Sequence, residues 1–169
     1  IVKQHGGYVR VYSELGRGTT FRLYFPQAEG EAAALRLSVP LEELGGHETI
    51  LIAEDQEQVR NLVCRILTEH GYTPVAGGSG EAALELYGQM GRLPDLLLTD
   101  VVMTGMDGLE LYQRLRERQP GICCVFMTGY AWEIISVHGE GTESAAVVQK
   151  PFSQRDLLGK IRRALDAGK

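Results

Sequence analysis

The chain has 169 residues, of which 44% are hydrophobic and 23% charged, as in a globular protein rather than a disordered one. No apolar run approaches the roughly 20 residues that a transmembrane helix requires, and the N-terminus lacks the layout of a signal peptide. We therefore expect this segment to be cytoplasmic and to make no membrane contact, while a longer parent protein could be membrane-anchored upstream. The net charge of −5 and the absence of a basic cluster argue against nucleic-acid binding. The cysteines, Cys64, Cys123 and Cys124, are expected to be buried reduced thiols.

Residues 1–26 predict a small β-hairpin, because Tyr8–Tyr12 and Thr19–Phe25 each alternate in polarity around a turn-rich segment. A hairpin of this size cannot bury enough surface to fold alone. Residues 27–48 are acidic and rich in Ala and Gly, and we interpret them as a linker. The chain begins with Ile rather than Met, so we expect it to be part of a longer protein.

Residues 49–169 alternate between short apolar segments and amphipathic segments, which predicts five β-α repeats. Near-continuous apolar strands are typical of a parallel sheet that is covered on both faces. We therefore expect a doubly wound α/β domain. Its predicted strands are Thr49–Ala53, Thr73–Ala76, Asp95–Thr99, Ile122–Met127 and Ala145–Val148.

Helices are predicted between and after these strands from apolar spacing and from helix-start signals. The last one begins with Ser153 and Asp156, whose spacing is that of a capping box. The others are expected around residues 59–67, after Ser79–Gly80, after Asp107, and in a short segment from Trp132 to about Val137.

Polar residues stand at the carboxyl ends of four predicted strands, where ligands bind in open α/β sheets. They are Glu54 and Asp55 after the first strand, Asp100 after the third, Thr128 at the end of the fourth, and Lys150 after the fifth. Taken singly, each has an ordinary structural explanation, such as a helix cap or a surface charge. Their joint occurrence at one edge of the sheet predicts a functional site.

The chemistry of this set fits phosphoryl transfer to a carboxylate. Three clustered carboxylates repel one another, and a hard cation such as Mg²⁺ relieves that repulsion with oxygen ligands. A phosphoryl group arriving on Asp100 brings oxygens whose charge a metal, the Lys150 ammonium and the Thr128 hydroxyl can neutralise. The residues therefore predict that Asp100 accepts a phosphoryl group beside a divalent metal.

The segments ILIAEDQEQVR, DLLLTDVVMTGMDGLEL, FMTGY and VVQKPF resemble the response-regulator receiver family over residues 49–169. That resemblance implies a flavodoxin-like sheet of order 2-1-3-4-5 and phosphorylation of Asp100 by a phosphohistidine domain. It also implies that Mg²⁺ or Mn²⁺ binds Glu54, Asp55, Asp100 and the backbone carbonyl of Val102, with Thr128 and Lys150 contacting the phosphoryl group. By the same resemblance we expect a cis peptide bond between Lys150 and Pro151, the bond type in which cis is least costly.

The sequence departs from the family pattern at two positions. Thr104 stands where the family often has Pro, and this change should affect only the loop. Val147 stands three residues before Lys150, where the family commonly has an aromatic residue that switches rotamer together with the threonine.

The segment IVKQHGGYVRVYSELGRGTTFRLYFP resembles the end of the ATP-binding domain of sensor histidine kinases. This implies that residues 1–26 are a remnant of that domain and that the chain is the C-terminal part of a hybrid kinase. The kinase's nucleotide-binding motifs are missing here, so we expect a phosphoacceptor without an ATP site rather than a complete enzyme. The apolar hairpin strands are expected to pair with the same segment of another copy or to pack on a neighbouring receiver, forming a homo-oligomer, because open strand edges recruit further strands. The alternative is that the hairpin folds back on its own receiver.

Two alternatives differ in function class. A haloacid-dehalogenase-type phosphatase would carry a second Asp two residues after the nucleophile, where this chain has Val102. A pseudo-receiver, acting as an interaction module without phosphorylation, would be expected to lack some of the acidic residues. The sequence contains no P-loop motif, so a P-loop nucleotide-binding site is not expected.

Overall fold

The structure is a computed structural model that describes residues 2–3, 6–26, 40–129 and 145–168. The chain divides into two compact units, Ile1–Ser38 and Val39–Lys169, which we describe separately. The helix predicted from Trp132 lies outside the described residues. Among the described helices, none combines the length and apolar character needed to cross a membrane.

The first unit contains the predicted hairpin. Strands β1 (Tyr8–Glu14) and β2 (Gly18–Tyr24) pair antiparallel. The turn between them uses glycines at positive φ, at Gly16 and Gly18, a backbone conformation that other residues rarely adopt. The rings of Tyr8 and Tyr24 stack with their centroids 4.6 Å apart. Every residue of both strands is exposed within this unit.

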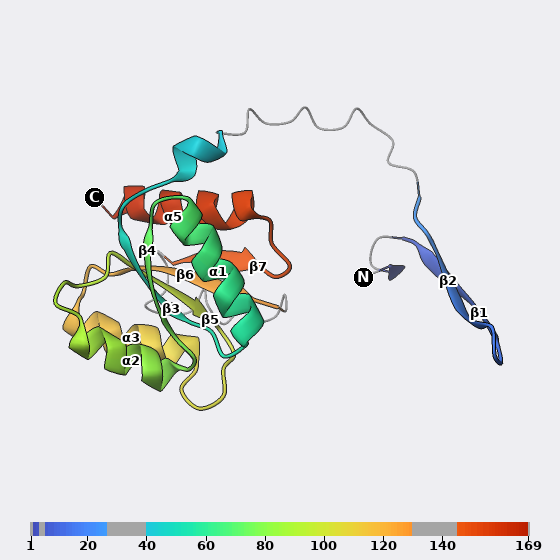
Figure 1. Cartoon of the computed structure of the whole chain (residues 1–169), viewed down its shortest axis with the longest axis horizontal. Helices are drawn as coiled ribbons and strands as arrows, with labels where there is room; N and C mark the ends of the chain where they lie inside the picture. The colour runs from blue at the N-terminus through green and yellow to red at the C-terminus, as the bar shows by residue number, and fades with distance from the viewer. Residues whose placement is uncertain (1, 4–5, 27–39, 130–144, 169) are drawn as a thin grey trace. The chain divides into compact units, whose positions relative to one another are not determined.

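The second unit contains a five-stranded parallel sheet of order β4-β3-β5-β6-β7 (Figure 1). Numbered within this unit alone, that order is 2-1-3-4-5, so the predicted flavodoxin-like topology is confirmed. The central strands are buried because both faces of the sheet are covered, as their unbroken apolar sequence indicates. The strands are β3 (Thr49–Ala53), β4 (Thr73–Gly77), β5 (Leu96–Asp100), β6 (Cys123–Thr128) and β7 (Ala146–Gln149).

Helices cover both faces of the sheet (Figure 1). One apolar cluster joins the sheet to α1 (Glu57–Glu69) and α5 (Gln154–Ala167), and a second joins it to α2 (Gly80–Gln89) and α3 (Gly108–Arg118). The predicted capping box of α5 is confirmed, because the Ser153 hydroxyl accepts from the Asp156 N–H while the Asp156 carboxylate accepts from the Ser153 N–H. Helix α3 is capped similarly by Asp107, whose carboxylate accepts from the Glu110 N–H.

A short 3₁₀ helix, η2 (Leu41–Leu44), packs on the second unit ahead of β3. Leu44 is buried in the cluster that includes α1 and α5, and its carbonyl accepts a hydrogen bond from the Tyr72 hydroxyl at 2.9 Å. Nearby, Nη2 of Arg162 donates to Oε1 of Glu48 at 2.8 Å. The last residues of the predicted linker are therefore anchored to the sheet domain.

The three cysteines are free. Cys124 is buried as predicted, whereas Cys64 and Cys123 are only half-buried. Burial raises the pKa of all three thiols, which keeps them protonated and poorly reactive at neutral pH. They are therefore packing residues in this domain.

Candidate functional site

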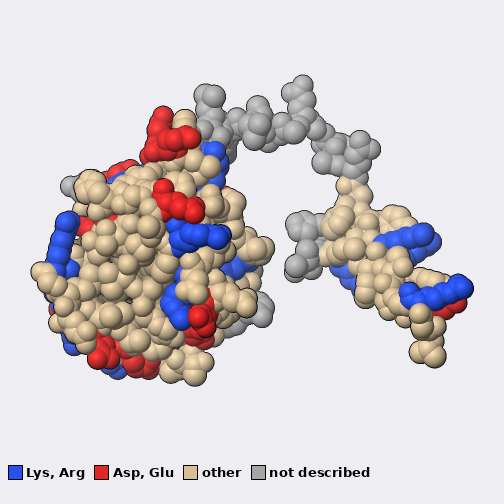
Figure 2. Space-filling model, in the orientation of Figure 1, with Lys and Arg blue, Asp and Glu red and all other residues tan. Residues whose placement is uncertain are grey.

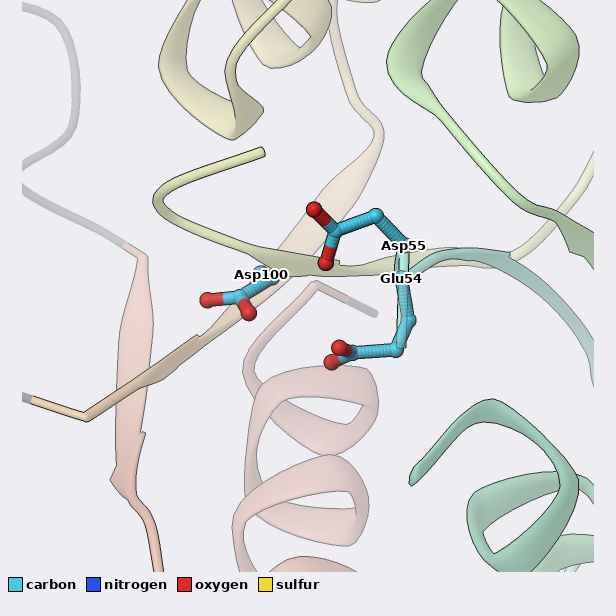
Figure 3. A group of neighbouring side chains, drawn as sticks. All are labelled: Glu54, Asp55 and Asp100. Carbon is cyan, nitrogen blue, oxygen red and sulfur yellow. The ribbon is translucent and has the colours of Figure 1, made fainter. Parts of the chain in front are cut away.

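The carboxyl ends of β3 and β5 bring three acidic residues together. Ala53 pairs with Thr99 across these adjacent strands, so Glu54 and Asp100, the next residue on each strand, lie side by side. Asp55 follows Glu54, and one carboxylate oxygen from each of the three residues lies within 4.8 Å of the others. Figure 3 shows the three carboxylates converging on one space from two different strand ends. The sequence predicted this cluster from the strand-end rule.

The Lys150 ammonium lies against two of these carboxylates. Its Nζ atom is 2.6 Å from Oε2 of Glu54 and 2.7 Å from Oδ2 of Asp100. The peptide bond between Lys150 and Pro151 is cis, as predicted. The structure therefore joins the fifth strand end to the first and third through charge-assisted hydrogen bonds, which are stronger than neutral ones.

Burial dominates the electrostatics of Glu54, whose side chain is fully buried. Burial raises the pKa of Glu54, and the hydrogen bond and attraction from Lys150 offset this only in part. For Lys150, burial would lower the pKa of the ammonium, but its hydrogen bonds to Asp100 and Glu54 outweigh burial and raise the pKa above the usual value. Lys150 is therefore held in the charged form that an anionic group requires.

Thr128 is the last residue of β6 and is completely buried. Asp100 of β5 pairs with Met127 of the neighbouring strand β6, and Thr128 is the next residue along β6. The Thr128 carbonyl accepts a 2.7 Å hydrogen bond from the Lys150 backbone N–H. Thr128 and Lys150 thus lie beside Asp100 at one edge of the sheet, as the sequence indicated.

Val102 lies in the loop that follows Asp100, and its side chain is exposed. The loop is anchored at its start, where the Val101 N–H donates to the Met127 carbonyl at 3.0 Å. It is also anchored from α2, where Oε1 of Glu81 accepts from the Met106 N–H at 2.8 Å. The contact of Glu81 was not predicted from the sequence, because its partner is a main-chain group that no side-chain pattern reveals.

A second residue missed by the sequence analysis is Arg60, in the first turns of α1. Its Nη1 atom donates to the carbonyl of Glu54 at 2.7 Å and to that of Asp55 at 3.4 Å. A basic residue shortly after an acidic pair was the only available signal, and such a residue is most often a solvated helix charge.

Val147, which replaces the aromatic residue common at this position, pairs with Phe126 in the sheet. It packs against the apolar cluster that contains Phe126, Tyr112 and Leu111. In this chain the position three residues before Lys150 therefore carries a small side chain that packs in the core.

The donor set suits a hard divalent cation. All three side chains offer carboxylate oxygens, the ligands that Mg²⁺ prefers, and their separation allows one ion to reach all of them. Glu54 is buried and close to a second carboxylate, so a cation would relieve both the burial cost and the repulsion. The residues present fit a magnesium ion.

Comparison with known proteins identifies the class of protein. The family model of the response regulator receiver domain matches residues 50–162, which is more than half of the chain. The chain belongs to the response regulator receiver family. Receiver domains bind Mg²⁺ at an acidic pocket and interact with histidine kinases or phosphotransfer proteins, and Glu54, Asp55 and Asp100 form a cluster of acidic residues here.

Particular relatives agree with this class. The sensor kinase CckA of Brucella abortus is 34% identical over 98% of this chain, but the match spans only 18% of CckA. The response regulator receiver protein CpdR of the same organism is 36% identical over 70% of this chain and 97% of its own length. A CheY-like receiver domain from Methanospirillum hungatei has a TM-score of 0.64 and 27% identity, over 73% of this chain and 97% of the other.

Proposed function

We propose that this chain is the phosphoryl-accepting part of a two-component signalling protein, in which Asp100 receives a phosphoryl group from a phosphohistidine. The observation that carries the proposal is the placement of the Lys150 ammonium 2.7 Å from Oδ2 of Asp100 beside a cluster of three carboxylates. An anionic acceptor, a fixed cation and a metal-ligand set in one place are the parts that phosphoryl transfer requires.

The metal would be held by Glu54, Asp55 and Asp100, with the Val102 backbone carbonyl as a further ligand. When bound, Mg²⁺ supplies positive charge that offsets the negative charge of the carboxylates and of the phosphoryl oxygens. The fit of the donor set and the burial of Glu54 support this assignment.

The remaining chemistry belongs to residues of this chain. A carboxylate oxygen of Asp100 attacks phosphorus, and a new O–P bond forms while the P–N bond to the histidine breaks. The electron pair of the broken bond leaves with the imidazole nitrogen. The Lys150 ammonium and the Thr128 hydroxyl stabilise the charge on the phosphoryl oxygens during transfer. The raised pKa of Lys150 supports this role, because the side chain stays charged at neutral pH.

We also propose that residues 1–26 are the end of a histidine kinase ATP-binding domain, residues 27–48 a linker, and residues 49–169 the receiver of a hybrid kinase. The alignment with CckA, which covers 98% of this chain, supports the arrangement because it includes the hairpin as well as the receiver. The partner would be a phosphohistidine domain of a kinase or phosphotransfer protein. Since such partners act in the cytoplasm, the receiver would act there too.

Incubation with a small acyl phosphate and Mg²⁺ tests the acceptor. The expected product carries one hydroxylamine-labile phosphate, detected by intact mass, and Asp100→Asn should carry none. Asp107→Asn is a matched control, because Asp107 caps α3 and is not part of the acidic cluster of Glu54, Asp55 and Asp100. Labelling of Asp100→Asn would contradict the assignment. A folded wild-type chain that takes up no phosphate would instead favour an interaction module without phosphorylation.

A further inference from the structure

Arg60 reaches back from α1 to the backbone that carries the acidic pair. One guanidinium nitrogen, Nη1, donates to the Glu54 carbonyl at 2.7 Å and to the Asp55 carbonyl at 3.4 Å. The side chain comes from the helix that directly follows this turn. None of the roles assigned to the acceptor or the metal involves Arg60, so its position requires a separate explanation.

The turn between β3 and α1 explains why these carbonyls need a side-chain donor. The helix is capped by Gln56, whose carbonyl accepts the first helical hydrogen bond, from the Arg60 N–H at 2.9 Å. Glu54 and Asp55 precede that cap, so the helical ladder does not include their carbonyls. The Arg60 guanidinium supplies a charged hydrogen-bond donor to these two carbonyls.

The other atoms around the turn leave the guanidinium little freedom. A Cβ atom added at Gly78 would lie 3.4 Å from Nη1 of Arg60, so the loop after β4 closes over the guanidinium. The Glu54 backbone is held from the same side, because its N–H donates to the Gly77 carbonyl at 3.2 Å. Arg60 is therefore confined between the turn and the neighbouring loop.

We propose that Arg60 is a positioning residue for metal binding, an inference that rests on the proposed function. By bonding both carbonyls, its guanidinium fixes the two peptide groups from which the Glu54 and Asp55 side chains leave, so that both carboxylates reach one ion. Residues that hydrogen-bond to metal-binding residues typically lower the metal affinity about 10–100-fold when they are mutated.

Charge and positioning predict opposite results when Arg60 is removed. As a cation near a metal site, Arg60 repels Mg²⁺, so loss of its charge alone would strengthen metal binding. Loss of positioning would weaken it, because the carboxylates would no longer converge. The sign of the change in metal affinity therefore separates the two effects.

The test is calorimetric titration of the full chain and its variants with Mg²⁺. Arg60→Met should weaken binding about 10–100-fold. Arg60→Lys should weaken it less, because an ammonium keeps the charge and can donate to one carbonyl. Arg65→Met is the matched control on the same helix. Arg65 is exposed, and its ion pair with Glu69 is long, at 4.0 Å, so wild-type affinity is expected.

The initial rate of labelling by acyl phosphate gives a second readout. At saturating Mg²⁺ the Arg60→Met rate should return to within a few-fold of wild type, because a positioning residue acts through metal affinity. Melting temperatures of both Arg60 variants show whether each is folded, and Arg60→Lys carries the test if Arg60→Met is not.

Tighter or unchanged Mg²⁺ binding by a folded Arg60 variant would overturn the inference. A rate that stays low at saturating Mg²⁺ would also overturn it. If the folded wild-type chain bound no Mg²⁺, the proposed function would fail and this inference with it. The wild-type titration therefore distinguishes the two failures.

Discussion

The ammonium of Lys150 lies 2.7 Å from the carboxylate of Asp100, although the two residues are 50 positions apart in the chain. The same ammonium lies 2.6 Å from Glu54, a residue with a fully buried side chain. One cation therefore offsets two carboxylates at the edge of the sheet. We expect both the stability of the domain and the proposed phosphoryl transfer to depend on this arrangement.

Replacing Lys150 with Met should destabilise the receiver by about 3–5 kcal/mol, because one partner of a buried ion pair is left without compensation. The loss should shrink as the pH falls toward 5, since Glu54 has a raised pKa and its protonated form needs no cation. Urea unfolding followed by circular dichroism measures both effects. Lys160→Met removes the same charge from α5 and should have little effect. Equal stability of the two variants would contradict the prediction.

The Glu48–Arg162 pair predicts a distinct acid dependence. Burial, the largest influence, raises the pKa of Glu48, but hydrogen bonds from Arg162 and the backbone outweigh it, so the pKa lies below its usual 4.5. A lowered carboxyl pKa contributes stability above the unfolded value, and that stability is lost as the pH falls through the folded value. Glu48→Gln should therefore cost about 1.5–3 kcal/mol at neutral pH and progressively less below about pH 4.5.

Urea titrations of wild type and Glu48→Gln across this pH range test the prediction. Glu43→Gln, on the exposed side of η2, is the control and should follow the wild-type curve at every pH. A constant difference between wild type and Glu48→Gln from neutral to acidic pH would show that the charge of Glu48 does not contribute.

Leu44→Ala should reduce the free energy of unfolding of the receiver by about 2–5 kcal/mol, because Leu44 is buried in the core beside α1 and α5. Leu15→Ala, at a fully exposed turn of the hairpin, should change it by less than about 0.5 kcal/mol. A chain shortened to begin at Pro40 should be more stable than one that begins at Thr49, because it retains the packing of Leu44. Identical melting temperatures of the two shortened chains would argue that residues 40–48 contribute nothing.

The hairpin predicts self-association. Val11 and Phe21 lie directly opposite each other on one face, both are exposed within their unit, and a two-stranded sheet has two open edges. We expect these strands to pair with the same segment of a second copy. Light scattering should show an oligomer for the whole chain and a monomer for a chain beginning at Pro40. Phe21→Lys should shift the whole chain toward monomer, and a monomeric wild type would refute the prediction.

The sequence was sufficient to predict the sheet and the clustering of acidic and basic residues at its edge, because both follow from local patterns. Unbroken apolar segments indicate strands buried on both faces, and in a parallel sheet the residues after such strands meet at one edge. Glu54, Asp100 and Lys150 were predicted on this basis, and all three are in contact or adjacent in the structure.

The sequence could not predict features that depend on tertiary contacts with the main chain. Residues 40–48 have the composition of a linker. Their packing is seen only in the structure, for example in the contacts of Leu44 with Tyr72 and of Glu48 with Arg162. The roles of Arg60 and Glu81 were missed for a similar reason. Their hydrogen-bond partners are backbone groups, and a sequence does not reveal which backbone groups lack a regular partner.

The adjacency of β3 and β5 at the centre of the sheet also has a consequence for folding. Strand β4 lies between them in sequence but on the outer side of β3 in space. Glu54 and Asp100 therefore meet only after the crossover segment α1-β4-α2 has folded and β5 has paired with β3. A chain without that crossover cannot assemble the acidic cluster that we propose as the metal site. Because the proposed magnesium ion would bind only the folded chain, rising Mg²⁺ concentration should draw the folding equilibrium toward the native state by mass action.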